Sequence, residues 1–138
     1  MRITKTLSIA ILTLLIAGCS LFSDYWILEE ERLSEVPEVR TYTERLQQDE
    51  YLDSATFSIF TISEERKMVV IFSGDKTKAF EFSHKKNTKK DQEIIVKEID
   101  NETNHNNPFL LVGLDKIEGD LQVYNETTKE YIINADEN

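Results

Sequence analysis

Apolar and polar residues alternate with a period of two along most of the chain after residue 55, and this period is typical of β-strands. Segment 56–62 places apolar side chains on both faces of such a strand. The unbroken apolar row at 68–72 indicates a central strand that is buried on both faces. The polar residues 63–66 between the two segments indicate a hairpin turn.

The same pattern predicts more short strands in the rest of the chain. They are expected at 78–83, 93–99, 108–114, 121–124 and 131–133. Polar stretches that contain Gly, Asp and Asn separate them, and these residue types are common in turns. Six or seven short strands joined by polar turns predict a mainly β fold, namely a small antiparallel β-sandwich or barrel.

Residues 38–53, which precede the first of these strands, carry two patterns at once. Val39, Tyr42 and Leu46 lie at helical spacing, and Pro37 suits the first turn of a helix. Threonines that alternate within the same segment would also suit a strand. We favour a short N-terminal helix here and keep a strand as the alternative.

The first eighteen residues have the organisation of an export signal. Arg2 and Lys5 precede an apolar run, and small residues follow that run. The run from Leu7 to Gly18 is shorter than the roughly 20 residues that a membrane-spanning helix needs. The position of the basic residues before the run favours export of everything after it.

The residues at the end of this run, Ile16-Ala17-Gly18-Cys19, resemble the lipobox of bacterial lipoproteins, in which a branched residue and two small residues precede a cysteine. The resemblance implies cleavage before Cys19 and lipid chains on its sulfur, and two or more chains give stable anchoring. Cys19 is the one cysteine of the chain, and without lipid it would be a free thiol in an oxidising compartment. The alternative is an ordinary cleaved signal peptide with an incidental cysteine.

The lipobox interpretation divides the chain into a signal peptide at 1–18, a lipid-anchored membrane-proximal segment at 19–37 and a single β-rich domain at 38–138. We expect the apolar patch at 21–28 to pack on the domain, and its placement at the lipid headgroups is the alternative. No Gly-, Ser- or Pro-rich linker is present, so the domain should sit close to the membrane. The expected location is the extracytoplasmic face of the cell membrane. The composition favours a Gram-positive source, and an outer-membrane location stays open.

Charge disfavours one class of partner. The formal net charge is −10, and removal of Arg2 and Lys5 with the signal peptide makes the mature chain more acidic still. We expect no binding to nucleic acid, because such binding depends on Lys and Arg that neutralise phosphates.

One basic cluster stands out on this acidic chain, and it consists of Lys85, Lys86, Lys89 and Lys90. It is predicted to form a hairpin tip, where lysines keep a long turn soluble and block edge pairing. The alternative role is a surface contact with anionic lipid headgroups or wall polymers.

The sequence contains no recognisable catalytic set. His84 and His105 are the two histidines, both in predicted polar loops, and their spacing does not suggest a metal site. No serine lies in a Gly-x-Ser-x-Gly turn, and no Gly-rich phosphate loop is present. Segment 100–107 is rich in oxygen ligands but lacks the glycine of a calcium loop, so a solvated turn is expected. We therefore predict no catalytic residue, no metal and no cofactor.

These features together predict a non-catalytic, membrane-anchored lipoprotein that acts as an extracytoplasmic binding or accessory module. Its expected partners are the membrane, through lipid on Cys19, and an envelope protein. Two other classes stay open. One is an envelope hydrolase or metal-dependent enzyme with an unrecognised site, and the other is an immunity or exclusion lipoprotein.

We expect Cys19→Ala to release the protein from the membrane fraction or to leave it unprocessed, because the acyl chains would have no sulfur to join. Mass spectrometry of the wild-type protein should find a diacylglyceryl group on the mature N-terminus. A mature wild-type protein with a free Cys19 thiol would contradict the lipobox interpretation.

Overall fold

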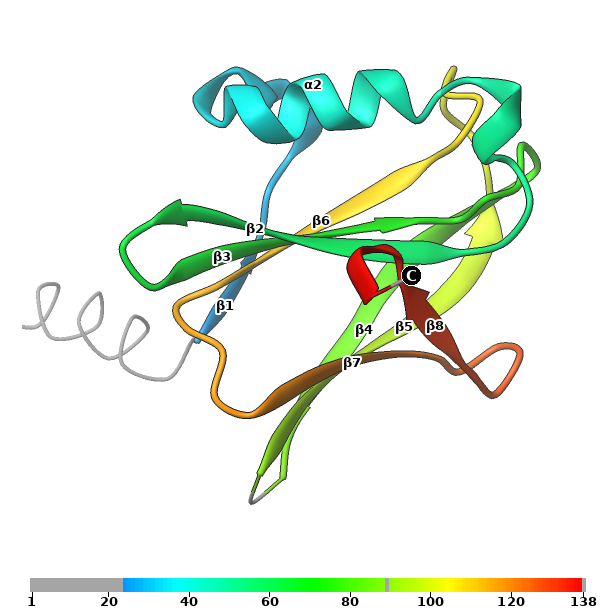
Figure 1. The fold of residues 1–138 in the computed structure, drawn as a ribbon. Helices are drawn as coiled ribbons and strands as arrows, with labels where there is room; N and C mark the ends of the chain where they lie inside the picture. The colour runs from blue at the N-terminus through cyan, green and yellow to red at the C-terminus, as the bar shows by residue number, and fades with distance from the viewer. Residues whose placement is uncertain (1–23, 89, 138) are drawn as a thin grey trace, which may run out of the picture.

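Eight strands form one curled sheet in the computed structural model, which describes residues 24–88 and 90–137. The strands are β1 (Tyr25–Ile27), β2 (Thr56–Ser63), β3 (Arg66–Phe72), β4 (Lys78–Asn87), β5 (Asp91–Asp100), β6 (Phe109–Leu114), β7 (Asp120–Asn125) and β8 (Glu130–Asn134). Their order across the sheet is β1-β6-β3-β2-β8-β7-β5-β4. The sheet curls into a half-barrel, so the prediction of a mainly β fold is confirmed (Figure 1).

Two strand pairs run parallel, and the prediction of a wholly antiparallel sheet is wrong at these two places. β5 pairs with β7 in parallel, and β2 pairs with β8 in parallel. The first pair arises because β6 lies between β5 and β7 in the chain but joins the other half of the sheet, beside β3. Alternation of side chains has the same period in parallel and antiparallel strands, so the sequence pattern does not distinguish them.

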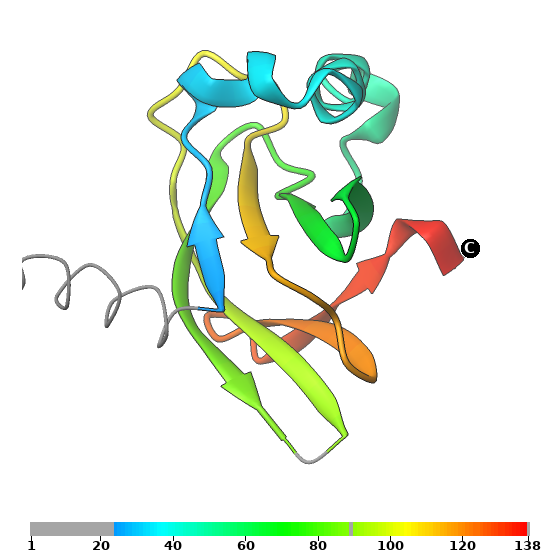
Figure 2. The ribbon, with the colours of Figure 1, turned by 90° about the vertical axis from the view of Figure 1, so that its left-hand side faces the viewer.

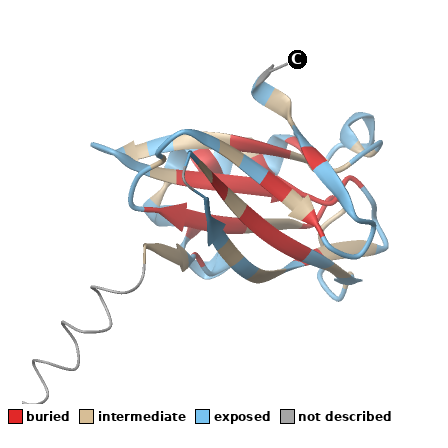
Figure 3. Cartoon of the chain, turned by 90° about the horizontal axis from the view of Figure 1, so that it is seen from below, coloured by how far each residue is buried: buried red, intermediate tan, exposed pale blue. Residues whose placement is uncertain are grey.

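β3 is buried on both faces, as its apolar row predicts. Val69 and Ile71 face the interior of the half-barrel, and both are 0% exposed. Val70 and Phe72 face the opposite side, and they are 0% and 1% exposed. The hairpin turn expected at 63–66 is present between β2 and β3, with Glu64 in the left-handed conformation. Figure 3 shows the buried residues gathered in the middle of the sheet.

A layer of three short helical segments covers the outer face of β1, β6, β3 and β2 (Figures 1 and 2). This helix layer consists of the 3-10 helix η1 (Glu30–Glu35), the α-helix α2 (Pro37–Arg45) and the 3-10 helix η2 (Asp49–Tyr51). α2 begins at Pro37, whose missing N–H costs nothing in a first turn, and it buries Val39 against the sheet. In residues 24–88 and 90–137, no helix is long and apolar enough to cross a membrane.

The end of the membrane-proximal segment is part of the sheet. β1 pairs with β6, Tyr25 packs against the interior core, and Trp26 packs beneath the helix layer. A Cβ atom on Gly113 would lie 2.0 Å from the ring of Trp26, so the indole lies flat on β6 where a side chain is missing. Packing of this segment on the domain is confirmed for Tyr25, Trp26 and Leu28, whereas Ile27 is 40% exposed and Leu21 and Phe22 lie outside the described residues.

Side-chain contacts join the open edges of the sheet, which are β1 and β4. The rings of Tyr25 and Phe82 stack with their centroids 4.8 Å apart. The strand register of β4 shifts after Phe82, and this shift places Lys85 opposite the interior residue Ile94. The Nζ atom of Lys85 donates a hydrogen bond of 2.5 Å to Asp24, and the Lys85 side chain is only 3% exposed.

Asp24 is charged in this ion pair at neutral pH. Partial burial of Asp24 acts to raise the pKa of its carboxyl group. The hydrogen bond and the charge of Lys85 act in the opposite direction, and the net result is a pKa below the ordinary value of 3.8. The pair therefore stabilises the fold above the ordinary pKa, and this contribution is lost as the pH falls through the lowered pKa.

Ile71→Ala should lower the free energy of unfolding by about 2–5 kcal/mol, because it removes buried methyl groups and leaves a cavity at a fully buried position. Urea unfolding of the wild type and the variant measures this loss. Ile133→Ala is the matched control, since Ile133 is 52% exposed and should change stability by less than about 1 kcal/mol. Equal losses in the two variants would contradict the double burial of β3.

Asp24→Asn should destabilise the fold more than Lys85→Met. The first variant leaves a buried ammonium without its anion and should cost about 1–3 kcal/mol, reduced by water that reaches the half-exposed Asp24. The second variant removes the charge and keeps an apolar chain of similar length, so it should cost under about 1 kcal/mol.

Urea unfolding at pH 7 and at pH 3 tests this order. Asp24→Asn should lose less stability than the wild type between the two pH values, because it lacks the carboxyl group with the lowered pKa. A larger loss of unfolding free energy for Lys85→Met than for Asp24→Asn at pH 7 would contradict this interpretation of the ion pair.

Candidate functional site

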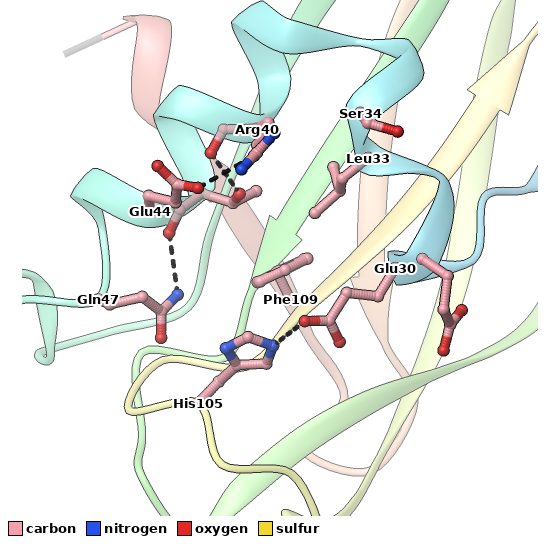
Figure 4. A pocket seen from close by; sticks show the side chains of 10 residues that line it. Glu30, Leu33, Ser34, Arg40, Glu44, Gln47, His105 and Phe109 are labelled. Carbon is pink, nitrogen blue, oxygen red and sulfur yellow. Dashed lines mark hydrogen bonds and ion pairs between the residues drawn. The ribbon is translucent and has the colours of Figure 1, made fainter.

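A pocket of about 420 Å³ lies between the helix layer and the loop that leads into β6 (Figure 4). We call it the helix-layer pocket. The helix layer and the residues after it supply Glu30, Leu33, Ser34, Arg40, Glu44 and Gln47. The loop and the start of β6 supply His105 and Phe109.

The loop is held against the helix layer by one buried asparagine. Asn107 is 1% exposed, its Oδ1 atom accepts a hydrogen bond from the Gly74 amide, and its Nδ2 atom donates to the Leu46 carbonyl. The side chain of Gln47 bonds to both main-chain groups of Asn107, at 2.8 Å and 2.9 Å. The expectation of a solvated turn at 100–107 is wrong at Asn107, because its amide is the connection between the two layers.

His105 and Glu30 meet across the pocket. The Nε2 atom of His105 forms a hydrogen bond with Oε1 of Glu30, although 75 residues separate them in the chain. The imidazole packs on Phe109, with the ring centroids 5.0 Å apart, and 28% of its side chain is exposed. The sequence placed His105 in a polar loop without a predicted role, and it gave no sign of its carboxylate partner.

The pocket combines an apolar floor with an acidic rim. Leu33 and Phe109 form the floor, and Leu33 is only 9% exposed. Glu30 and Glu31 lie on the rim, while Glu44 is paired with Arg40 at 3.2 Å. Such a lining suits a ligand that has an apolar stem and a cationic head, because the stem can cover the floor and the head can meet the carboxylates.

The geometry around the histidines differs from that of a hydrolytic triad. The Ser34 hydroxyl points away from the His105 ring, and no hydrogen bond joins them (Figure 4). His84 lies on β4, where its Nδ1 atom bonds to the hydroxyl of the neighbouring Ser83 at 3.0 Å. Within the described residues, no group of three His, Cys, Asp or Glu side chains is placed to hold a metal ion.

The four lysines of the basic cluster have different surroundings. Lys85 is not available for a surface contact, because its side chain is buried and bonded to Asp24, so that part of the hypothesis is wrong. β4 continues to Asn87, which places Lys85 and Lys86 on a strand and shortens the predicted turn. Lys86 and Lys90 are exposed, and Lys89, like Cys19, lies outside the described residues.

Comparison with known proteins places the chain in a family. No protein-family model matches it, and no solved structure matches it. It is 41% identical over 121 residues to "Uncharacterized protein YycS" of Bacillus subtilis (strain 168), and the match covers 85% of each chain. Identity of this degree over most of both chains means that this protein belongs to the same family as YycS of Bacillus subtilis.

Proposed function

We propose that this protein is a lipid-anchored, non-catalytic lipoprotein on the extracytoplasmic face of the cell membrane, and that its helix-layer pocket binds a cationic group of an envelope partner. One observation carries the proposal. The described chain begins on the side of the half-barrel away from the helix layer, and β1 runs from there towards the helix layer on the outer face of the sheet (Figures 1 and 2).

Only a few residues separate Cys19 from the start of the fold. Asp24 is the fifth residue after Cys19, and five residues span at most roughly 17 Å when fully extended. A lipid on Cys19 would hold the start of β1 at the headgroups. The helix layer and its pocket would then face away from the membrane, towards other molecules of the envelope.

The lining of the pocket supports a basic side chain as the bound group. A lysine or arginine of a partner could lay its aliphatic stem on Phe109 and Leu33 and direct its charge to Glu30 and Glu31. Hydrogen bonds of this kind to ionised groups contribute about 1.5–3 kcal/mol each. The His105 ring orients the Glu30 carboxylate, and this role needs no nucleophile beside it.

Binding of a minimal probe tests the pocket. The probes are the amide of Nα-acetyl-lysine and the amide of Nα-acetyl-norleucine, which has a similar apolar stem and no charge. NMR titration of the full-length protein in lipid nanodiscs should show shifts at His105 and Phe109 with the lysine probe. We expect at least tenfold weaker binding of the norleucine probe, because it cannot form a charge-assisted hydrogen bond.

The double variant Glu30→Gln, Glu31→Gln should weaken binding of the lysine probe by at least about tenfold. Glu118→Gln is the matched control, because Glu118 lies in a different pocket, at the end of the half-barrel away from the helix layer. Unchanged binding in the double variant, or equal binding of the two probes, would overturn the proposed role of the pocket.

A further inference from the structure

A second pocket of about 520 Å³ lies at the end of the half-barrel where β1 starts. We call it the barrel-end pocket. The turn between β2 and β3, the hairpin of β4 and β5 and the loop between β6 and β7 surround it. Its lining includes Asp24, Asn87, Lys90, Asp91, Gln92 and Lys116.

The wall of this pocket is fixed by close backbone contact. Gly119 has a φ of +74°, and a Cβ atom there would lie 1.5 Å from the carbonyl oxygen of Lys90. The loop before β7 therefore lies directly on the start of β5, where Asp91 pairs with Asp120. The Oδ1 atom of Asp91 also accepts a hydrogen bond of 3.4 Å from the Asp120 amide.

Gln92 lines this pocket and carries a buried polar atom without a partner among the described residues. The residue is 9% exposed, and its Nε2 atom donates a hydrogen bond of 3.4 Å to the Lys116 carbonyl. Its Oε1 atom is buried and accepts no hydrogen bond from any group of the described residues. A buried acceptor without a donor is costly, so the pocket favours a ligand that supplies an N–H or O–H group.

Existing ion pairs use only part of the charge around the pocket. Asp24 is paired with Lys85, Lys116 with Glu118 at 2.7 Å, and Asp115 with Arg66 at 3.8 Å. Three other lining residues, Glu65, Asp91 and Lys90, form no ion pair within the described part of the chain. Two carboxylates and one ammonium that form no ion pair with another described residue are complementary to a ligand that carries both a cation and an anion.

We propose that the barrel-end pocket binds a primary ammonium group joined to a phosphate, the chemistry of phosphoethanolamine. The ligand ammonium can donate three hydrogen bonds, which matches Gln92 Oε1 together with the Asp91 carboxylate. The Lys90 ammonium meets the phosphate. The membrane as the source of this group rests on the proposed lipid anchor, which places the pocket against the headgroups.

The sharpest test compares two compounds with the same charges and different hydrogen-bond donors. The ammonium of O-phosphoethanolamine has three N–H groups, whereas the quaternary ammonium of O-phosphocholine has no N–H group. Full-length protein in phosphatidylcholine nanodiscs is titrated with each compound, and NMR follows the side-chain amide signals of Gln92. We expect O-phosphoethanolamine to bind at least tenfold more tightly. Equal binding of the two, or no binding of either, overturns the proposal.

Variants connect the binding to the named groups. Gln92→Met keeps the length of the side chain and removes the acceptor, so it should weaken O-phosphoethanolamine binding at least tenfold. Gln92→Glu places a carboxylate at the same position and should bind at least as tightly as the wild type. Glu30→Gln, in the helix-layer pocket, should leave this binding unchanged. Weaker binding in Gln92→Glu with an intact fold by circular dichroism would also overturn the proposal.

Two further experiments are needed. One identifies the source of the phosphoethanolamine group, and the other tests whether its binding depends on the lipid anchor. In nanodiscs that contain phosphatidylethanolamine, the Gln92 signals should already be shifted, and the soluble compound should add nothing. Unshifted signals in these nanodiscs would overturn the membrane source and assign the site to a soluble or wall-attached phosphoethanolamine. Cys19→Ala should bind the soluble compound as the wild type does, so a failure of the anchor is distinguished from a failure of the pocket.

Discussion

The double burial of β3 is the constraint on which the rest of the structure depends. Val69 and Ile71 on one face and Val70 on the other are all 0% exposed. Apolar side chains on both faces of a strand must both be removed from water, at roughly 25 cal/mol for each Å² of apolar surface. One face is covered because the sheet curls over it, and the other is covered because the helix layer packs on it. The curled sheet and the helix layer therefore each remove one face of β3 from water.

The helix-layer pocket is a consequence of this cover. α2 has nine residues, and an isolated helix of this length is not stable in water, so its position depends on the side chains beneath it. The polar link through Gln47 and Asn107 then fixes the loop beside it. Glu30 and His105 meet because the two segments that carry them are both held against the same face of the sheet.

The sequence predicted elements whose pattern is local, and it missed contacts that depend on distant segments. The unbroken apolar row located β3, because burial on both faces imposes that pattern directly, and the polar residues before it located the turn that joins it to β2. β1 was not predicted, since a strand of three residues is too short to show a period. The inward position of Lys85 follows from a shift of strand register, and no residue type in the sequence predicts this shift. The pairing of His105 with Glu30 was not predicted, because the two residues lie 75 positions apart in the chain and only the fold brings them together.

The open end of the half-barrel and its helix-covered face place different demands on the same fold. At the open end, Asp24 and Lys85 join the sheet edges with charged groups, because this end is where the chain enters and an apolar closure would have to exclude water there. On the helix-covered face, Leu33 and Phe109 give an apolar floor because the helix layer already excludes water. A cation at the helix-layer pocket would meet carboxylates above an apolar surface, where their attraction is stronger than in bulk water. A ligand at the barrel-end pocket would replace water around groups that are already polar, so selectivity there depends on matched hydrogen-bond donors and acceptors more than on burial.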